Sequence, residues 1–199
     1  MIDAAAQLER DKYERMWTHD AYRGDHSTAH AAAAIARFQP SRGDSFIDFG
    51  AGAGYAGRHL QDAGFGVLAI DIAANAMEPS IARRVPLLVG NLWDVPVDVT
   101  ADWGFCCDVM EHIPPDRIHD VMRFVRKSTL RSTYFSISLR PDGCGQLIGH
   151  PLHLTVHQQP WWMVTLSKHW QRLTVVHHEA NQTLELVADG WAERDTRSR

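Results

Sequence analysis

Short apolar runs alternate with longer stretches of mixed polarity through most of the chain. The runs read SFIDF, FGVLAID, VPLLVG, DWGFCC and STYFSISL, and they begin after Pro40. Runs of this length are typical of buried strands, and the stretches between them are typical of helices. Strands that alternate with helices predict an α/β fold, in which helices cover both faces of a parallel sheet.

The clearest helix is predicted over PPDRIHDVMRFVRK, residues 114–127. Ile118, Val121, Met122 and Val125 fall on one stripe of this segment, and basic residues lie in its last turn. Nearer the C-terminus, PWWMVTLSKHW predicts another helix. The runs RLTVVHH and TLELVA predict an antiparallel hairpin, because only EANQ separates them. We therefore expect a closing helix and a hairpin over residues 161–190.

Two further segments flank the predicted core at residues 45–139. Residues 1–40 contain two helical patterns separated by a polar loop, and we expect them to form a cap or lid. Residues 140–160 contain three glycines and three prolines and show no clear periodicity. Irregular segments of this length are often functional, so we expect this one to form a loop on the substrate side.

Composition narrows the class of protein. The 199 residues are 45% hydrophobic and 22% charged, with a formal net charge of -4, which predicts one soluble globular domain over residues 1–199. No apolar run approaches the roughly 20 residues of a membrane span, and the N-terminal segment is charged where a signal peptide is apolar. We therefore expect a cytoplasmic protein. The absence of a dense Lys/Arg block argues against a nucleic-acid partner.

The stretch SFIDFGAGAGYAG contains a glycine-rich loop that fits two registers. From Gly52 it spells G-x-G-x-x-G, the dinucleotide fingerprint, and from Asp48 it spells D-x-G-x-G-x-G. The fingerprint needs its first glycine directly after the strand, and the apolar run ends at Phe49. Since the Gly52 register places two extra residues there, we favour the Asp48 register, with glycines at 50, 52 and 54.

Four motifs in order resemble the class I S-adenosylmethionine-dependent methyltransferases, in particular their compact small-molecule members. They are FIDFGAGAGYAGRHL, VLAIDIAANAM, VGNLWDVP and GFCCDVMEHIPPDRI, and the resemblance covers residues 45–139. It implies a Rossmann-like three-layer sandwich with a seven-stranded, mostly parallel sheet in the order 3-2-1-4-5-7-6. It also implies that strand 7 is antiparallel, in agreement with the predicted hairpin.

The resemblance implies S-adenosylmethionine as the cofactor and assigns residues to it. Asp48 and the loop glycines would hold the methionine end, and Asp71 would accept the ribose hydroxyls. Ile72 would cover one face of the adenine, while Asn91 and Leu92 would lie at its edge. The full set of cofactor-binding candidates is Asp48, Gly50, Gly52, Gly54, Asp71, Ile72, Asn91, Leu92, Asp108, Tyr22 and Arg23. Tyr22 and Arg23, like the aromatic pair Tyr13 and Trp17, could fold over the cofactor from the N-terminal segment, although the spacing of the pair favours ordinary core packing for Trp17.

Candidate catalytic residues follow the fourth strand and lie in the irregular loop. Glu111 and His112 stand at the edge where such sheets bind ligands, so they can act as acid or base or orient the turn before the two prolines. His153 belongs to HPLHLTVH, whose histidines at 150, 153 and 157 would share one face of a helix. Pro151 and the β-branched residues argue against that helix, so we expect no metal site there. We expect His153 to contact substrate or relay protons, and the alternative is that these histidines are plain surface residues.

The sequence therefore supports three hypotheses. The first is methyl transfer from S-adenosylmethionine to oxygen, nitrogen or carbon of a small-molecule acceptor. The second is a nicotinamide-dependent oxidoreductase that uses the Gly52 register, since NAD enzymes also carry an acid at the position of Asp71. The third is a non-catalytic module that binds S-adenosylmethionine.

Overall fold

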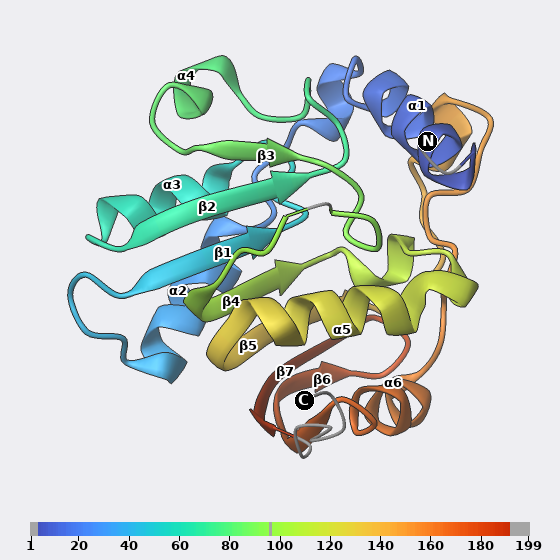
Figure 1. Ribbon diagram of the computed structural model, residues 1–199. Coiled ribbons are helices and arrows are strands. Elements are labelled where there is room, and N and C mark those ends of the chain that lie inside the picture. The colour runs from blue at the N-terminus through green and yellow to red at the C-terminus, as the bar shows by residue number, and fades with distance from the viewer. Residues whose placement is uncertain (1–3, 96, 192–199) are drawn as a thin grey trace.

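The computed structural model describes residues 4–95 and 97–191, in which a seven-stranded sheet lies between two layers of helices (Figure 1). The strands are β1 Ser45–Phe49, β2 Gly66–Asp71, β3 Leu87–Val89, β4 Ala101–Cys107, β5 Thr129–Ser138, β6 Trp170–Glu179 and β7 Thr183–Trp191. The α-helices are α1 Ala4–Met16, α2 Thr28–Phe38, α3 Tyr55–Asp62, α4 Pro79–Ala82, α5 Ile118–Ser128 and α6 Gln159–Leu166. Short 3-10 turns are η1 Asp20–Tyr22, η2 Met110–His112, η3 Pro115–Arg117 and η4 Gly145–Leu147.

The strand order is β3-β2-β1-β4-β5-β7-β6. Strand β1 pairs in parallel with β2 and β4, and β7 pairs antiparallel with both β5 and β6. Both the predicted order and the predicted C-terminal hairpin are therefore confirmed. The antiparallel strand inserted beside β5 separates this sheet from the 3-2-1-4-5-6 order of a dinucleotide-binding domain.

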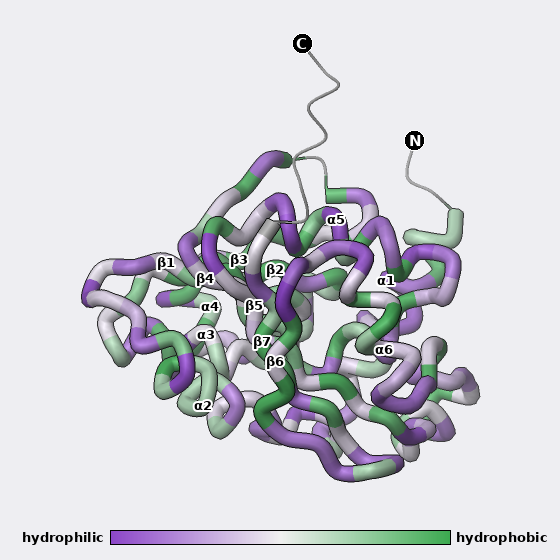
Figure 2. Tube along the Cα trace, turned by 90° about the horizontal axis from the view of Figure 1, so that it is seen from below, coloured by the Kyte–Doolittle hydropathy of each residue, from purple (hydrophilic) through white to green (hydrophobic). Residues whose placement is uncertain are grey.

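Alternating side chains of the strands build a core on each face of the sheet. On one face, Phe46 of β1 packs with Leu60 of α3 and Ala34 of α2. On the other face, Ile47 packs with Val121 of α5 and Leu166 of α6. Each large side chain buried in this way contributes about 1.5–3 kcal/mol to stability. Figure 2 shows hydrophobic stretches along the strands in the centre of the view and hydrophilic stretches along many outer loops.

The N-terminal helix and the segment between β5 and α6 meet at the carboxyl ends of the parallel strands (Figure 1). Met16 of α1 packs with Ile148 and Leu152 of this β5–α6 segment, residues 139–158. Helix α6 begins at residue 159, slightly before the boundary that the sequence predicts. None of the described helices has the length and apolar character of a membrane span.

Candidate active site

The glycine loop connects β1 to α3 and follows the Asp48 register. Gly50, Gly52 and Gly54 have φ values of 71°, 53° and 86°, and α3 begins at the next residue, Tyr55. Residues with a Cβ rarely adopt this left-handed conformation, so each of these positions favours glycine. The alternation of glycine and alanine in the sequence therefore matches an alternation of backbone conformation.

Close neighbours also constrain the loop glycines. A Cβ on Gly50 would lie 2.4 Å from Cγ2 of Val109, and a Cβ on Gly52 would lie 3.1 Å from the indole of Trp17. Gly54 instead faces α4, where a Cβ would lie 3.0 Å from a carbon of Ile81. Gly50 and Gly52 therefore border a cavity, whereas Gly54, predicted as a cofactor contact, packs against a helix.

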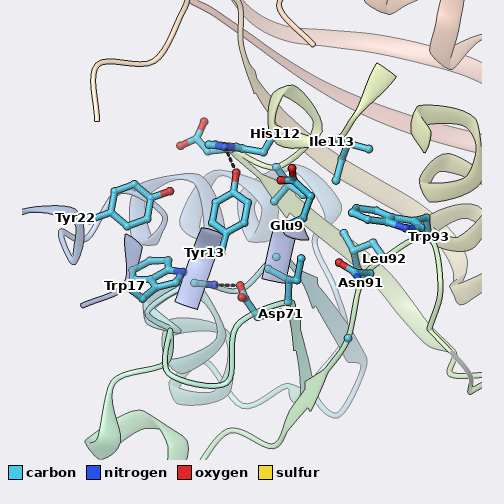
Figure 3. Close-up of a pocket in the computed structure, with 16 residues that line it drawn as sticks. Glu9, Tyr13, Trp17, Tyr22, Asp71, Asn91, Leu92, Trp93, His112 and Ile113 are labelled. Carbon is cyan, nitrogen blue, oxygen red and sulfur yellow. Dashed lines mark hydrogen bonds between the residues drawn. The ribbon is translucent and has the colours of Figure 1, made fainter. Parts of the chain in front are cut away.

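A cavity lies at the carboxyl ends of β1, β2 and β4, beneath α1 (Figure 3). Its lining consists of Glu9, Tyr13, Trp17, Tyr22, Gly50, Gly52, Asp71, Ile72, Gly90, Asn91, Leu92, Trp93, Asp108, Val109, His112 and Ile113. Most of the predicted site residues are brought together here, although they come from distant parts of the chain. Sheets of this kind bind ligands at this edge.

Asp71, at the end of β2, fixes the position of the glycine loop. Its Oδ2 accepts a hydrogen bond of 2.8 Å from the Gly52 N–H, and its Oδ1 accepts one of 2.9 Å from the Ala73 N–H. Burial raises the pKa of Asp71 to about 6, although these backbone N–H groups lower it in part. Each carboxylate oxygen keeps a second lone pair that can accept a hydrogen bond from a ligand hydroxyl.

Asp48, predicted to hold the methionine end of the cofactor, lies behind the loop and is not among the residues that line the cavity. It is 2% exposed, and a Cβ on Gly57 of α3 would lie 3.3 Å from its Oδ2. Burial and the nearby charge of Asp71 raise the pKa of Asp48 to about 7, while the backbone N–H of Gly57 lowers it. Its position under α3 makes Asp48 a support for the loop.

Arg23, predicted as a cofactor contact, is not among the residues that line the cavity. Tyr22 lines the cavity, but the guanidinium of Arg23 points to the segment between β2 and α4. It forms an ion pair of 3.0 Å with Glu78 and donates to the carbonyl of Asn75 at 2.8 Å. Arg23 therefore ties the N-terminal segment to the rest of the fold and does not line the cavity.

The far wall of the cavity carries polar atoms without partners. Figure 3 shows Asn91, Leu92 and Trp93 on one side and Trp17 and Tyr22 on the other. Within the described part of the chain, Oδ1 of Asn91 and Nε1 of Trp93 are buried and have no hydrogen-bond partner. Since buried polar atoms are normally paired, this wall is suited to a ligand that supplies both a donor and an acceptor.

Tyr13 of α1 and His112 of η2 meet at another wall of the cavity. The hydroxyl of Tyr13 lies 2.7 Å from Nδ1 of His112, as the dashed line in Figure 3 marks. The ring of His112 meets the ring of His153 edge to face, with 4.6 Å between centroids. Burial, with a contribution from His153, lowers the pKa of His112 to about 3, so the imidazole is neutral at pH 7.

Glu111 and His153 do not line the cavity but adjoin His112. Glu111 is 0% exposed; its Oε1 accepts a hydrogen bond from the Ser138 N–H at 2.9 Å, while burial raises its pKa well above the usual value. Its backbone carbonyl accepts hydrogen bonds from Leu154 and Thr155, which hold the β5–α6 segment against η2. The sequence predicted that Glu111 and His153 lie near the site. The hydrogen bonds to the Glu111 carbonyl explain how His153 comes to lie beside His112.

The other two histidines of HPLHLTVH lie elsewhere. Residues 151–158 contain no helix, as Pro151 predicts, so the shared helical face does not form. His150 lines a neighbouring hollow together with Lys12 of α1. His157 stacks on Trp161, with 4.0 Å between ring centroids.

Some residues that line the cavity were not predicted from the sequence. Glu9 lies on α1, and nothing in the local pattern of α1 distinguishes it from a solvent-exposed residue. Val109 and Ile113 flank the predicted Glu111 and His112, but their apolar side chains indicated only core packing.

Similarity to proteins of known structure agrees with the architecture. The sequence matches no protein-family model and no curated protein sequence. The 1,6-didemethyltoxoflavin-N1-methyltransferase of Burkholderia thailandensis, solved with 1,6-didemethyltoxoflavin and S-adenosylhomocysteine, superposes with a TM-score of 0.68 at 18% identity over 93% of this chain and 88% of that one. The chain has the class I methyltransferase fold.

Two further structures share this methyltransferase fold. The PH0226 protein of Pyrococcus horikoshii has a TM-score of 0.65 at 16% identity, over 87% of this chain and 92% of that one. DhpI, solved in complex with SAH, has a TM-score of 0.65 at 17% identity, over 94% of this chain and 96% of that one. The similarity extends over most of the length of each chain.

Proposed function

We propose that this chain is an S-adenosylmethionine-dependent methyltransferase that acts on oxygen, nitrogen or carbon of a small-molecule acceptor. The observation that carries the proposal is the cavity, where a D-x-G-x-G-x-G loop fixed by Asp71 faces the unpaired Oδ1 of Asn91. The antiparallel β7 supports it against the nicotinamide alternative, because the dinucleotide sheet lacks that strand.

The chain's residues match the three parts of this cofactor. The backbone at Gly50 and Gly52 would border the methionine end, with the carboxylate of Asp108 for its ammonium group. The free lone pairs of Asp71 would accept the ribose hydroxyls. Ile72 and Leu92 would cover the adenine, and Oδ1 of Asn91 would accept a hydrogen bond from its amino group. Tyr22 would close the site from the N-terminal segment.

When bound, the cofactor supplies a methyl group on a positively charged sulfur, and the carbon–sulfur bond breaks as an acceptor lone pair forms the new bond. The protein's own work is to align the acceptor and exclude water. Tyr13 of α1 and Trp17, directly after this helix, line the cavity and help to exclude water. For an acceptor that carries a proton, we assign the loss of that proton to the cluster of Glu111, His112 and His153, in which His112 lines the cavity and meets the ring of His153.

A small acceptor is supported by the site and by one structural neighbour. The cavity is lined in part by aromatic and apolar side chains, among them Tyr13, Trp17 and the Val109 and Ile113 that flank η2. Such a lining suits a compact acceptor better than a polymer. The Burkholderia enzyme is an N1-methyltransferase of 1,6-didemethyltoxoflavin, so the same fold accommodates a compact heterocycle in that protein.

Calorimetry with S-adenosylhomocysteine on a pair of variants tests these assignments. In Asp71→Asn the carboxylate loses its charge, and we expect at least tenfold weaker binding, since hydrogen bonds to charged groups contribute about 1.5–3 kcal/mol each. Asp62→Asn is the control, because Asp62 pairs with Arg84 on the exposed side of α3 and should leave binding unchanged. Equal affinities of Asp71→Asn and wild type would refute the ribose assignment.

A further inference from the structure

Three potential metal ligands converge beside the cavity. Glu111 and His112 lie on the η2 turn after β4, and His153 comes from the β5–α6 segment. One ligand atom from each residue lies within 4.8 Å of the others. Ligands of a tetrahedral zinc ion are roughly 3–4 Å apart when the metal bonds measure about 2.0–2.2 Å, so small side-chain rotations would complete such a site.

The buried carboxylate of Glu111 needs a partner that the described residues do not supply. Its Oε1 is bonded to the Ser138 N–H, but its Oε2 is buried and has no hydrogen-bond partner among them. A buried carboxylate oxygen without a donor or a cation is energetically unfavourable. A role limited to orienting the turn would account for Oε1 and would leave Oε2 unexplained.

Both histidines have the surroundings of metal ligands. Nδ1 of His153 lies 2.6 Å from the carbonyl of Arg140, so Nδ1 carries the hydrogen and Nε2 carries the lone pair. A metal-binding histidine commonly donates its other ring N–H to a backbone carbonyl in this way. For His112, an Nδ1–H can donate to the hydroxyl of Tyr13, which in turn can donate to the carbonyl of Leu152, leaving Nε2 unprotonated.

We propose that Glu111, His112 and His153 bind one divalent transition-metal ion, such as Zn²⁺, Mn²⁺, Fe²⁺ or Co²⁺. Two imidazoles and one carboxylate suit these ions, and three protein ligands leave at least one coordination position open. Because His112 lines the cavity, the open position is accessible to an acceptor oxygen.

A bound ion would give the cluster a specific role in methyl transfer to oxygen. Coordination lowers the pKa of an acceptor hydroxyl, whose proton passes to solvent. The resulting oxygen lone pair forms the bond to the methyl carbon, and the sulfur keeps the electron pair of the broken bond. This role rests on the proposed function, whereas metal binding itself does not.

Titration of the full-length, chelator-treated protein with Co²⁺ alone, followed by calorimetry and visible absorption, tests the proposal. We expect one Co²⁺ per wild-type chain and at least tenfold weaker binding in His153→Ala and in Glu111→Gln. His150→Ala is the matched control, since His150 lies three residues away, outside the cluster, and should bind Co²⁺ as wild type does. If Glu111→Gln fails to fold, the partly exposed His153→Ala decides.

Two results would overturn the site: no stoichiometric Co²⁺ binding by the wild type, or equal affinities of the wild type and His153→Ala. Binding of S-adenosylhomocysteine to the metal-free protein is measured in parallel. If S-adenosylhomocysteine binds and Co²⁺ does not, only the metal site fails. If Co²⁺ binds in the expected pattern and S-adenosylhomocysteine does not, the metal site stands and the proposed function fails.

Discussion

Single residues define the site through backbone conformation and burial, and Gly50 is the clearest case. It adopts φ 71° and leaves no room for a Cβ, because Cγ2 of Val109 would lie 2.4 Å away. Comparison with Gly64 separates the positive φ from the lack of room for a Cβ. Gly64 has φ 95°, but a Cβ there would meet no described atom within 4 Å. The two glycines therefore share the strain and differ in the steric contact.

We expect Gly50→Ala to lower the free energy of unfolding by about 2–5 kcal/mol, from left-handed strain of about 1–2 kcal/mol and overpacking of about 1–3 kcal/mol. Gly64→Ala should lose only the contribution from left-handed strain. Denaturant unfolding of both variants measures the difference. Adding Val109→Ala to Gly50→Ala removes the clashing methyl groups, so a double variant no more stable than Gly50→Ala would contradict the steric account.

Asp48 makes stability depend on pH. Its pKa is about 7 in the fold, raised by burial and by Asp71, and an unfolded aspartate titrates near 4. A raised pKa means that the stabilising contribution of the protonated form is complete below about pH 4 and is lost as the pH rises through about 7. Asp48→Asn should therefore remove part of the decrease in unfolding free energy between pH 5 and pH 8.

Denaturant titrations at both pH values check this expectation. Asp62→Asn serves as the control on the surface of α3 and should keep the wild-type slope. If the unfolding free energy of Asp48→Asn falls between the two pH values as much as that of the wild type, the carboxyl of Asp48 is not the group responsible.

At the scale of elements, the site depends on how the N-terminal segment is held over the sheet. Arg23 joins this segment to the loop after β2 through Glu78 and two backbone carbonyls. On the other side, Met16 packs against the β5–α6 segment. Together with the Asn75 amide, which donates to the carbonyl of Glu14, these contacts hold Tyr13 and Trp17 at the cavity.

We expect Arg23→Met to speed the dissociation of S-adenosylhomocysteine several-fold without altering the sheet. The expectation follows because a cover held by fewer bonds opens more often. Stopped-flow measurement of the dissociation rate, with circular dichroism for the fold, tests it. Arg84→Met breaks an exposed ion pair with Asp62 and provides the control. An unchanged rate in Arg23→Met would show that α1 does not limit ligand release.

The contrast between local and distant contacts explains which parts of the site the sequence could predict. The glycine loop and Asp71 stand at the ends of recognisable apolar runs, so spacing located them, and the family resemblance assigned Asn91. Tyr13 touches His112 across 99 positions of sequence, and no periodicity in α1 indicates which of its faces meets the sheet. For the same reason the sequence named Arg23 as a ligand contact, although its partners Glu78 and Asn75 lie more than 50 residues away.

At the scale of the whole molecule, the sheet order connects these observations. The parallel strands bring the glycine loop, Asp71, Asn91 and Asp108 to one edge, and the β5–α6 segment brings His153 to the same edge. The antiparallel β7 beside β5 completes the class I methyltransferase fold that the superpositions show. The sequence predicted this order through resemblance, since strand patterns alone do not specify which strands are neighbours.

Calorimetry of the wild-type protein with S-adenosylhomocysteine, beside NAD, decides which cofactor the cavity binds. We predict one S-adenosylhomocysteine bound per chain and no detectable binding of NAD at the same concentrations. Binding of NAD without S-adenosylhomocysteine would contradict the proposed function, and the roles assigned to Asp71 and Asn91 would then belong to a dinucleotide site.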